Sequence, residues 1–232
     1  MKILKISNPT IVILVIAFTG NLFQYLFNAF LAQHLDPKLF GDFSIAKTFL
    51  ALGATFCVFG TDLSTSRFVK LLDTTGKFKF VRWCLKVLNL SSIILFLGLI
   101  PPAVFLLWAH FYGIHDFNNY HLAIGLVAAS PVIAIFIVII NNINARQKPL
   151  VAMTLNNIVC YSFLFSCSYL AARFISPVFD NETIISIYIA AFLILSLTAG
   201  WYFYSVSKSF NVYKLATDST PNHPHQDQWN AY

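Results

Sequence analysis

The stretch from Asp36 to Lys70 reads DPKLFGDFSIAKTFLALGATFCVFGTDLSTSRFVK and joins a short loop containing Pro and Gly to a long apolar run. We expect the loop at Asp36–Asp42 to open a helix that carries Lys47 and ends at the polar segment Phe59–Asp62. A lysine at the centre of a membrane-spanning helix costs about 2.5–3.5 kcal/mol on insertion scales, so it usually faces a partner or a watery cavity. This stretch therefore predicts a polar cavity inside a membrane protein.

The composition of the whole chain indicates the same setting. Of its 232 residues, 58% are hydrophobic and 10% are charged, and its mean hydropathy is +0.71. In soluble domains roughly a quarter of the residues are charged. This chain has too little charge for an ordinary soluble surface, and we predict an integral membrane protein.

Apolar runs divide the chain into predicted membrane spans. A span needs about 20 apolar residues to cross a hydrocarbon core of roughly 30 Å. Six runs meet this length, at about residues 9–33, 43–61, 84–109, 121–140, 151–172 and 184–206. We predict an all-α, polytopic membrane protein built as a six-helix bundle, followed by a polar tail at residues 207–232. The first run is too long and too rich in amides for a cleaved signal peptide, so we interpret it as a retained span.

The positive charges predict the orientation of these spans. Twelve of the 15 Lys and Arg residues fall on the side shared by both termini, and the exceptions are Lys38, Lys47 and Arg173. By the positive-inside rule, both termini are cytoplasmic. The basic loop from Arg67 to Lys86 is then next to anionic lipid, which attracts each basic residue by about 1 kcal/mol. Lipid contact explains the net charge of +6, and we expect no nucleic-acid partner.

Polar residues recur on one face of each of the first two spans. In the first span, Asn21, Gln24 and Asn28 follow each other at steps of three and four residues, so they share a helix face. In the second, Lys47 lies one helical step from Ser44 in a stripe of small and hydroxyl side chains. Such stripes are either helix-packing seams or the wall of a water-filled cavity. Three amides beside a charge favour the cavity, and these four residues are candidate substrate contacts.

Other polar and bent positions in the spans carry weaker signals. We interpret Asn156 and Asn157, and likewise Ser91 and Ser92, as packing contacts between helices. Pro131 and the pair Pro101-Pro102 imply kinks or breaks, because proline lacks a backbone donor and clashes with the preceding turn.

Asp62 and Arg67 lie near the cytoplasmic end of the second span. Both are candidate cavity residues, although their side chains can also snorkel to water and position the end of the helix. Lys47, with the second span at residues 43–61, is expected near the outer end of its helix.

No set of residues indicates catalysis or a metal site. The four cysteines show no CxxC spacing, and the pair His223 and His225 lies in a polar segment typical of a disordered tail. An enzyme needs a nucleophile or an acid/base pair held within reach. The cluster around His110, His115 and Asp116 matches no such arrangement. We predict a protein that is not an enzyme, with no catalytic residue, metal or cofactor.

At its start, the chain resembles a transporter family. Three segments carry the resemblance: Leu31–Leu35, Asp36–Ser44 and Phe59–Phe68. They are similar to the first part of the polysaccharide biosynthesis flippases. These are the Wzx-type oligosaccharide and O-antigen translocases of the multidrug/oligosaccharidyl-lipid/polysaccharide (MOP, MATE-like) exporter superfamily. In that family a Leu-Ala-Arg-like run and a Gly-Pro-x-x-Phe-Gly turn precede a Gly-x-x-x-x-x-x-Arg segment.

The match covers roughly the first 70 residues. Gly60 and Arg67 have the family spacing, whereas Gln33 stands where a basic residue is frequent and Leu35-Asp36 replaces Leu-Gly. The glycine of the Pro37–Gly41 turn has a physical reason, since glycine tolerates backbone conformations closed to other residues.

The resemblance implies a fold and a function. The fold is one lobe, the N-terminal half, of a transporter whose two six-helix lobes face each other across a central cavity. The function is translocation of an undecaprenyl-diphosphate-linked oligosaccharide across the cell inner membrane for O-antigen or capsule synthesis. Lys47 would attract the diphosphate, and Asn21, Gln24 and Asn28 would bind sugar hydroxyls.

The length of the chain qualifies this expectation. The family has twelve or more spans and this chain has about six, so a second lobe is needed, from a homodimer or a separate subunit, or the chain is a truncated product. Two other classes stay open: a membrane glycosyltransferase or polymerase, which would need acidic or histidine groups in a loop, and a lobe of a multidrug exporter or a membrane subunit that does not transport, which is favoured over the enzyme. An exporter coupled to cations favours a buried acidic residue at mid-span, which the sequence lacks.

Overall fold

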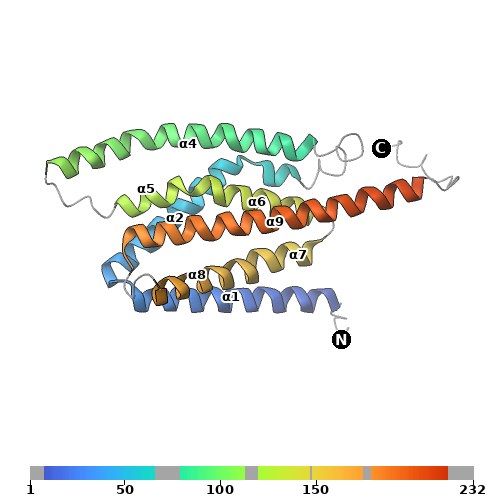
Figure 1. The fold of residues 1–232 in the computed structure, drawn as a ribbon, viewed down its shortest axis with the longest axis horizontal. Coiled ribbons are helices and arrows are strands. Elements are labelled where there is room, and N and C mark those ends of the chain that lie inside the picture. Colours follow the sequence, from blue (N-terminus) through green and yellow to red (C-terminus); the bar gives the residue numbers. More distant parts are fainter. Residues whose placement is uncertain (1–7, 66–78, 113–119, 147, 175–178, 219–232) are drawn as a thin grey trace, which may run out of the picture.

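The fold is a bundle of long helices, shown in Figure 1 for a computed structural model that describes residues 8–65, 79–112, 120–146, 148–174 and 179–218. The helices are α1 (Asn8–His34), α2 (Pro37–Val58), α4 (Lys79–Phe111), α5 (Tyr120–Ala128), α6 (Ser130–Ala145), α7 (Pro149–Met153), the π-helix η2 (Thr154–Val159), α8 (Cys160–Phe174) and α9 (Asn181–Asp218). The described residues contain no strand. The prediction of an all-helical chain is confirmed.

The helices lie side by side, with α4 and α1 at opposite edges of the bundle (Figure 1). α1 packs against η2 and α8, α9 packs against α6 and α8, and α2 packs against α4, α5 and α6. Although α1 and α2 follow each other in the chain, they are barely in contact. The two helices with predicted polar faces are therefore not a packed pair.

Five of the described helices are long and apolar enough to cross a membrane, and the bent pair α5–α6 brings the number to six if it is one span. This agrees with the six predicted runs. Many large apolar side chains are exposed on the bundle, for example Phe18, Leu107 and Trp201. Such exposure suits helices whose outer surfaces face lipid.

The core is centred on an aromatic contact among three helices. Tyr188 of α9 is buried, and its ring centroid lies 6.3 Å from that of Phe27 in α1 and 5.8 Å from that of Phe43 in α2. These are ordinary distances for paired aromatic rings. Tyr188 therefore joins α1 and α2, which otherwise stand apart, through α9.

Helix α2 begins earlier than predicted. Asp36 is its N-cap, accepting a hydrogen bond from the Lys38 backbone N–H at 3.2 Å, and Pro37 occupies the first turn, where its missing N–H costs nothing. The expectation of a loop through Asp42 was wrong, because this cap starts the helix at once. The positive backbone φ angles lie at the other end of α2, at Phe59 (46°) and Gly60 (74°).

The predicted fourth span is broken at Ala129, where α5 and α6 meet at 43°. Pro131 has no N–H to donate to the Val127 carbonyl, and the Ser130 hydroxyl donates to that carbonyl instead, at 2.6 Å. The break predicted at Pro131 is confirmed. At Pro101 and Pro102, by contrast, α4 continues as one helix.

The last helix also extends further than predicted. α9 runs to Asp218, so the first twelve residues of the expected polar tail continue the helix. The segment with His223 and His225 lies outside the described residues.

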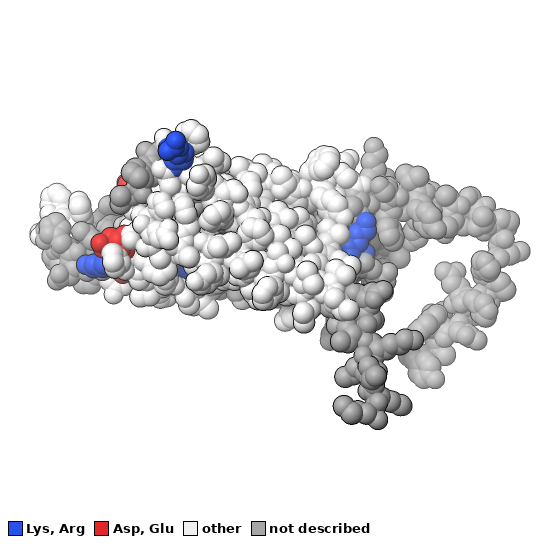
Figure 2. Space-filling model, turned by 90° about the horizontal axis from the view of Figure 1, so that it is seen from below, with Lys and Arg blue, Asp and Glu red and all other residues white. Residues whose placement is uncertain are grey.

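Charged side chains gather toward the two ends of the bundle. We call these the Asn8 end, where α1 begins and α9 ends, and the His34 end, where α1 ends and α2 begins. On the face shown in Figure 2, coloured atoms lie toward both ends and leave an uncharged belt between them. Because a hydrocarbon core excludes charge, this belt fits the spans found from helix length.

Candidate functional site

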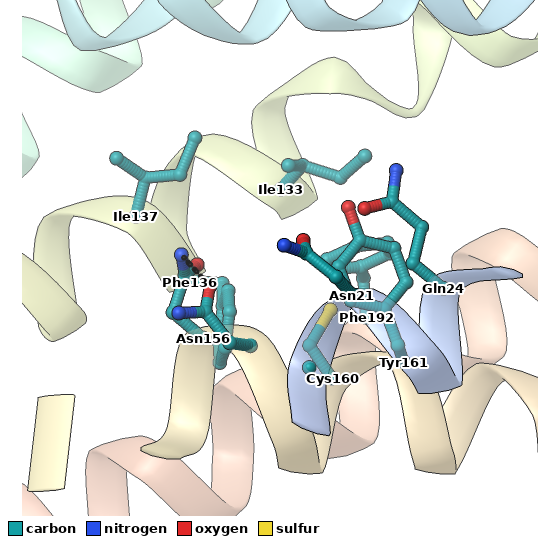
Figure 3. Close-up of a pocket in the computed structure, with 11 residues that line it drawn as sticks. Asn21, Gln24, Ile133, Phe136, Ile137, Asn156, Cys160, Tyr161 and Phe192 are labelled. Atoms are coloured by element: carbon teal, nitrogen blue, oxygen red, sulfur yellow. Dashed lines mark hydrogen bonds between the residues drawn. The ribbon is translucent and has the colours of Figure 1, made fainter. Parts of the chain in front are cut away.

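A cavity of about 230 Å³ lies between α1 and α6 and is partly open to the outside. Its other walls come from η2, α8 and α9 (Figure 3). The lining residues are Gly20, Asn21, Gln24, Ile133, Phe136, Ile137, Asn156, Asn157, Cys160, Tyr161 and Phe192. These residues fall near the middle of their candidate spans. The cavity is therefore at mid-membrane depth.

Three polar side chains in this cavity are available to a ligand. In Figure 3 the polar ends of Asn21, Gln24 and Tyr161 lie close together. Within the described residues, none of the three forms a hydrogen bond with the protein. An amide offers two donors and an acceptor, and a phenol offers one donor and an acceptor. The cavity can therefore bind several hydroxyl groups of one ligand.

The π-helix η2 supplies a fourth and fifth polar group. It places Asn156 and Asn157 on the cavity wall, where the Asn156 Nδ2 donates to the Asn157 Oδ1 at 3.2 Å. Short π-helical turns are frequent at functional sites because they change which side chains face inward. The interpretation of these two residues as packing contacts alone did not anticipate this position.

Lys47 lies beside the cavity rather than in its lining. Its Nζ is 6.0 Å from the centroid of the Tyr161 ring, near the outer limit of a cation–π contact. The side chain is half-buried, and within the described residues it has no carboxylate partner. Lys47 is thus a cation next to an uncharged polar cavity, with an aromatic ring but no described carboxylate beside it.

The depth of Lys47 differs from the prediction. Because α2 starts at Pro37, Lys47 is the eleventh of its 22 residues and stands at the middle of the span. The expectation of a position near the outer end was wrong. The cost of a mid-span lysine therefore applies in full, and it favours a functional role for this residue.

The other predicted site residues lie elsewhere. Asn28 is on α1, half-buried, one turn beyond Gln24 and outside the cavity lining. Asp62 is exposed in the short helical segment 61–65, past the end of α2 and near the Asn8 end. Arg67 lies outside the described residues. The structure brings together Asn21 and Gln24, with Lys47 beside them.

The hydroxyl stripe of α2 has a local explanation. Ser44, Thr48 and Thr55 are exposed, and each donates a hydrogen bond to the backbone carbonyl four residues earlier, at 3.0, 3.2 and 2.9 Å. Such bonds satisfy a hydroxyl inside its own helix. The stripe therefore does not need a watery cavity, unlike the amides of α1.

Ser91 is the packing residue that the sequence predicted. Its hydroxyl is buried and donates to the Cys57 backbone carbonyl at 2.6 Å, which links α4 to α2. Ser92 lies next to it, with its hydroxyl 3.8 Å from the Cys57 sulfur.

Tyr161 and Cys160 are among the cavity residues that sequence reasoning missed. Tyr161 lies in an aromatic-rich segment of an apolar span, where nothing separates a cavity residue from a core residue. A signal was available for η2, since two adjacent amides are unusual in a span and polar groups there are costly.

The fold and cavity together define a class: an α-helical integral membrane protein with a polar, partly open cavity among its spans. No protein-family model, curated protein or solved structure matches this chain.

Proposed function

We propose that this protein is one lobe of a flippase-type transporter. It would move an undecaprenyl-diphosphate-linked oligosaccharide across the cell inner membrane by alternating access, without covalent chemistry. The observation that carries the proposal is the mid-membrane cavity, where Asn21, Gln24 and Tyr161 form no hydrogen bond with other described residues and Lys47 stands alongside. The resemblance of the first 70 residues to such flippases supports it.

The cavity chemistry suits a lipid-linked sugar. The apolar tail of such a ligand stays in the bilayer, its hydroxyls need donors and acceptors, and its diphosphate needs a cation. The amide groups supply donors and acceptors for the hydroxyls, and Lys47 supplies the cation for the diphosphate. Because the cavity is partly open at the surface of the bundle, the tail can remain in lipid while the head group enters the cavity.

A second lobe is part of this proposal. The cavity is partly open at the surface of this single lobe. A transporter must enclose its cargo from one side at a time. We expect a facing lobe, from a second copy or another subunit, to cover the opening.

A cation-coupled multidrug exporter fits less well. Such a transporter favours a carboxylate at mid-span. The acidic residues of the described chain lie at or near helix ends, with Asp42 in the second turn of α2 and Asp180 and Glu182 at the start of α9.

The proposal is tested by translocation in proteoliposomes. The purified chain is reconstituted with a fluorescent prenyl-diphosphate-linked saccharide, and transfer is measured as the fraction that becomes inaccessible to a membrane-impermeant quencher. Lys47→Ala should reduce the initial rate at least about tenfold, because a charge-assisted hydrogen bond is worth roughly 1.5–3 kcal/mol.

The matched control is Lys38→Ala, which removes an exposed lysine from the first turn of the same helix. It should transport at the wild-type rate. Full transfer by Lys47→Ala would contradict the assignment of Lys47, and absence of transfer by the wild-type chain together with its facing lobe would contradict the flippase.

A further inference from the structure

We propose that the site has two chemically separate parts: an uncharged subsite that holds a single sugar ring, and an anion subsite at Lys47 for the adjoining phosphate. This rests on the proposed function and adds which part of the ligand each group binds. The observation behind it is the division of the polar groups, with amides and a phenol in the cavity and the cation outside its lining.

The size of the cavity limits what it can hold. Pockets for drug-sized ligands occupy about 300–1,000 Å³, and this cavity has about 230 Å³. At roughly 30 Å³ for each water, it has room for a handful of waters or one pyranose ring. A whole oligosaccharide does not fit, so further sugars must lie outside it.

The lining chemistry selects a neutral, polyhydroxylated ring. None of the eleven residues that line the cavity is charged. Asn21, Gln24 and Asn156 provide donors and acceptors for hydroxyls. Tyr161 and Phe136 add aromatic rings to the lining, and the negative quadrupole of an aromatic face attracts the weakly positive C–H groups of a sugar.

The position of Lys47 fits a group directly attached to that ring. Tyr161 lines the cavity, and the Lys47 Nζ lies 6.0 Å from its ring centroid. A compact ammonium with no carboxylate partner in the described residues suits a phosphate oxygen. Because Tyr161 lines the cavity and also contacts Lys47, the two subsites are adjacent.

The two subsites predict a pattern of specificity. The first sugar and its phosphate are recognised, whereas the length of the remaining saccharide is not. A ring that lacks its hydroxyls should bind the uncharged subsite more weakly, because it forms fewer hydrogen bonds with the amides.

The test is direct binding to the full chain in lipid nanodiscs, measured by calorimetry with two probes. Farnesyl β-glucopyranoside carries a sugar ring but no charge, so it tests the uncharged subsite. Farnesyl diphosphate carries the charged group but no sugar ring, so it tests the anion subsite. Gln24→Leu should weaken the glucoside about tenfold, in line with the loss of one or two hydrogen bonds, and change the diphosphate less than twofold. Lys47→Met should weaken binding of the diphosphate about tenfold and change binding of the glucoside less than twofold. Parallel weakening of both probes by either variant would overturn the two-part site.

Matched controls separate these effects from loss of folding. Gln33→Leu removes an exposed amide from the end of α1, and Lys38→Met removes an exposed lysine from α2. Both should bind the two probes as the wild type does.

A measurement on the unaltered chain adds a test without any variant. Inorganic pyrophosphate should bind equally well with and without saturating farnesyl glucoside, because the subsites are separate. Competition between the two would overturn the inference.

The outcomes also distinguish the inference from the proposed function. If the probes divide as expected and no lipid-linked saccharide is translocated, the two-part site stands and the flippase falls. If translocation occurs and both variants weaken both probes equally, the flippase stands and the two-part site falls.

Discussion

Gly20 sets how closely α1 approaches the π-helix η2. A Cβ added there would lie 2.5 Å from the Asn157 Cβ and 3.1 Å from the Asn157 carbonyl carbon. Neither atom is the flexible end of a side chain, so the two backbones would have to separate. Small residues allow such close contacts between helices in membranes. Gly20 and Asn157 both line the cavity, so this contact fixes the width of the site.

Gly20→Ala is therefore expected to destabilise the fold and to alter the cavity. Overpacking of this kind typically costs about 1–3 kcal/mol, measurable by reversible unfolding in mixed micelles. Gly98→Ala is the matched control, because a Cβ at Gly98 meets nothing within 4 Å and alanine is favoured over glycine inside a helix. Equal stability of the two variants would show that the contact at Gly20 does not hold α1 in place.

At the residue scale, the sequence predicted side chains better than backbone conformations. Asn21 and Gln24 line the cavity and Lys47 lies beside it, and all three stood out in the sequence because polar groups in an apolar run are costly wherever they point. The turn glycine was misplaced: Gly41 lies inside α2, and Gly60 has the positive φ of 74°. Both follow a Phe, so the local sequence does not separate them. The N-cap at Asp36 decides which becomes helical.

Helix α9 begins at a capping residue that lies outside the membrane-spanning segments. The Thr183 backbone N–H donates to the Asp180 Oδ1 at 2.8 Å. Hydrogen bonds from the Thr183 hydroxyl and backbone hold the pKa of the Asp180 carboxyl below its usual value. The ionised carboxylate therefore stabilises the first turn of α9, both as a cap and through the helix dipole.

Asp180→Ala should lower the free energy of unfolding by about 1 kcal/mol at neutral pH. Since the folded-state pKa is depressed, this stabilisation is fully present above the unfolded pKa of about 3.9 and is lost as the pH falls through the lower folded value. The difference between wild type and variant should therefore shrink in acid. The measurement is unfolding in micelles at neutral pH and at the lowest pH that the micelles tolerate.

The control for this cap is Glu182→Ala. Glu182 is an exposed acid in the first turn of the same helix, so it acts through the dipole, worth about 0.3–1 kcal/mol. A loss for Asp180→Ala no larger than that for Glu182→Ala would exclude the cap as its cause.

At the element scale, the sequence predicted that helices exist more reliably than it predicted their irregularities. Apolar length identifies a span because the bilayer sets it. Pro131 marked the break between α5 and α6, whereas Pro101 and Pro102 left α4 continuous. The adjacent amides Asn156 and Asn157 mark η2 as polar, but nothing in the sequence marks its π-helical backbone. It arises where α1 packs closely at Gly20, and such tertiary packing is invisible to a reading of the local sequence.

For the whole molecule, the two ends of the bundle differ in charge. Arg82, Lys86, Arg146 and Lys148 lie at the Asn8 end. Asp36, Asp42, Asp180 and Glu182 lie at the His34 end, together with Lys38 and Arg173, whereas Asp62 lies near the Asn8 end. The first described residue of α1 and the last of α9 lie at the same end (Figure 1). The chain therefore crosses the membrane an even number of times, which agrees with six spans when the α5–α6 pair is counted as one span.

We expect the Asn8 end to be cytoplasmic, because short cytoplasmic loops of membrane proteins carry an excess of Lys and Arg. The check uses a cysteine-free chain, with single cysteines at two exposed positions, Lys86→Cys at the Asn8 end and Glu182→Cys at the His34 end. A membrane-impermeant maleimide added to intact cells or spheroplasts should label Glu182→Cys alone, and permeabilised cells should label both. Labelling of Lys86→Cys in intact cells would reverse the orientation. It would also require the cargo of the proposed flippase to enter from the His34 end, past the acids at the start of α2 and α9, which repel a diphosphate.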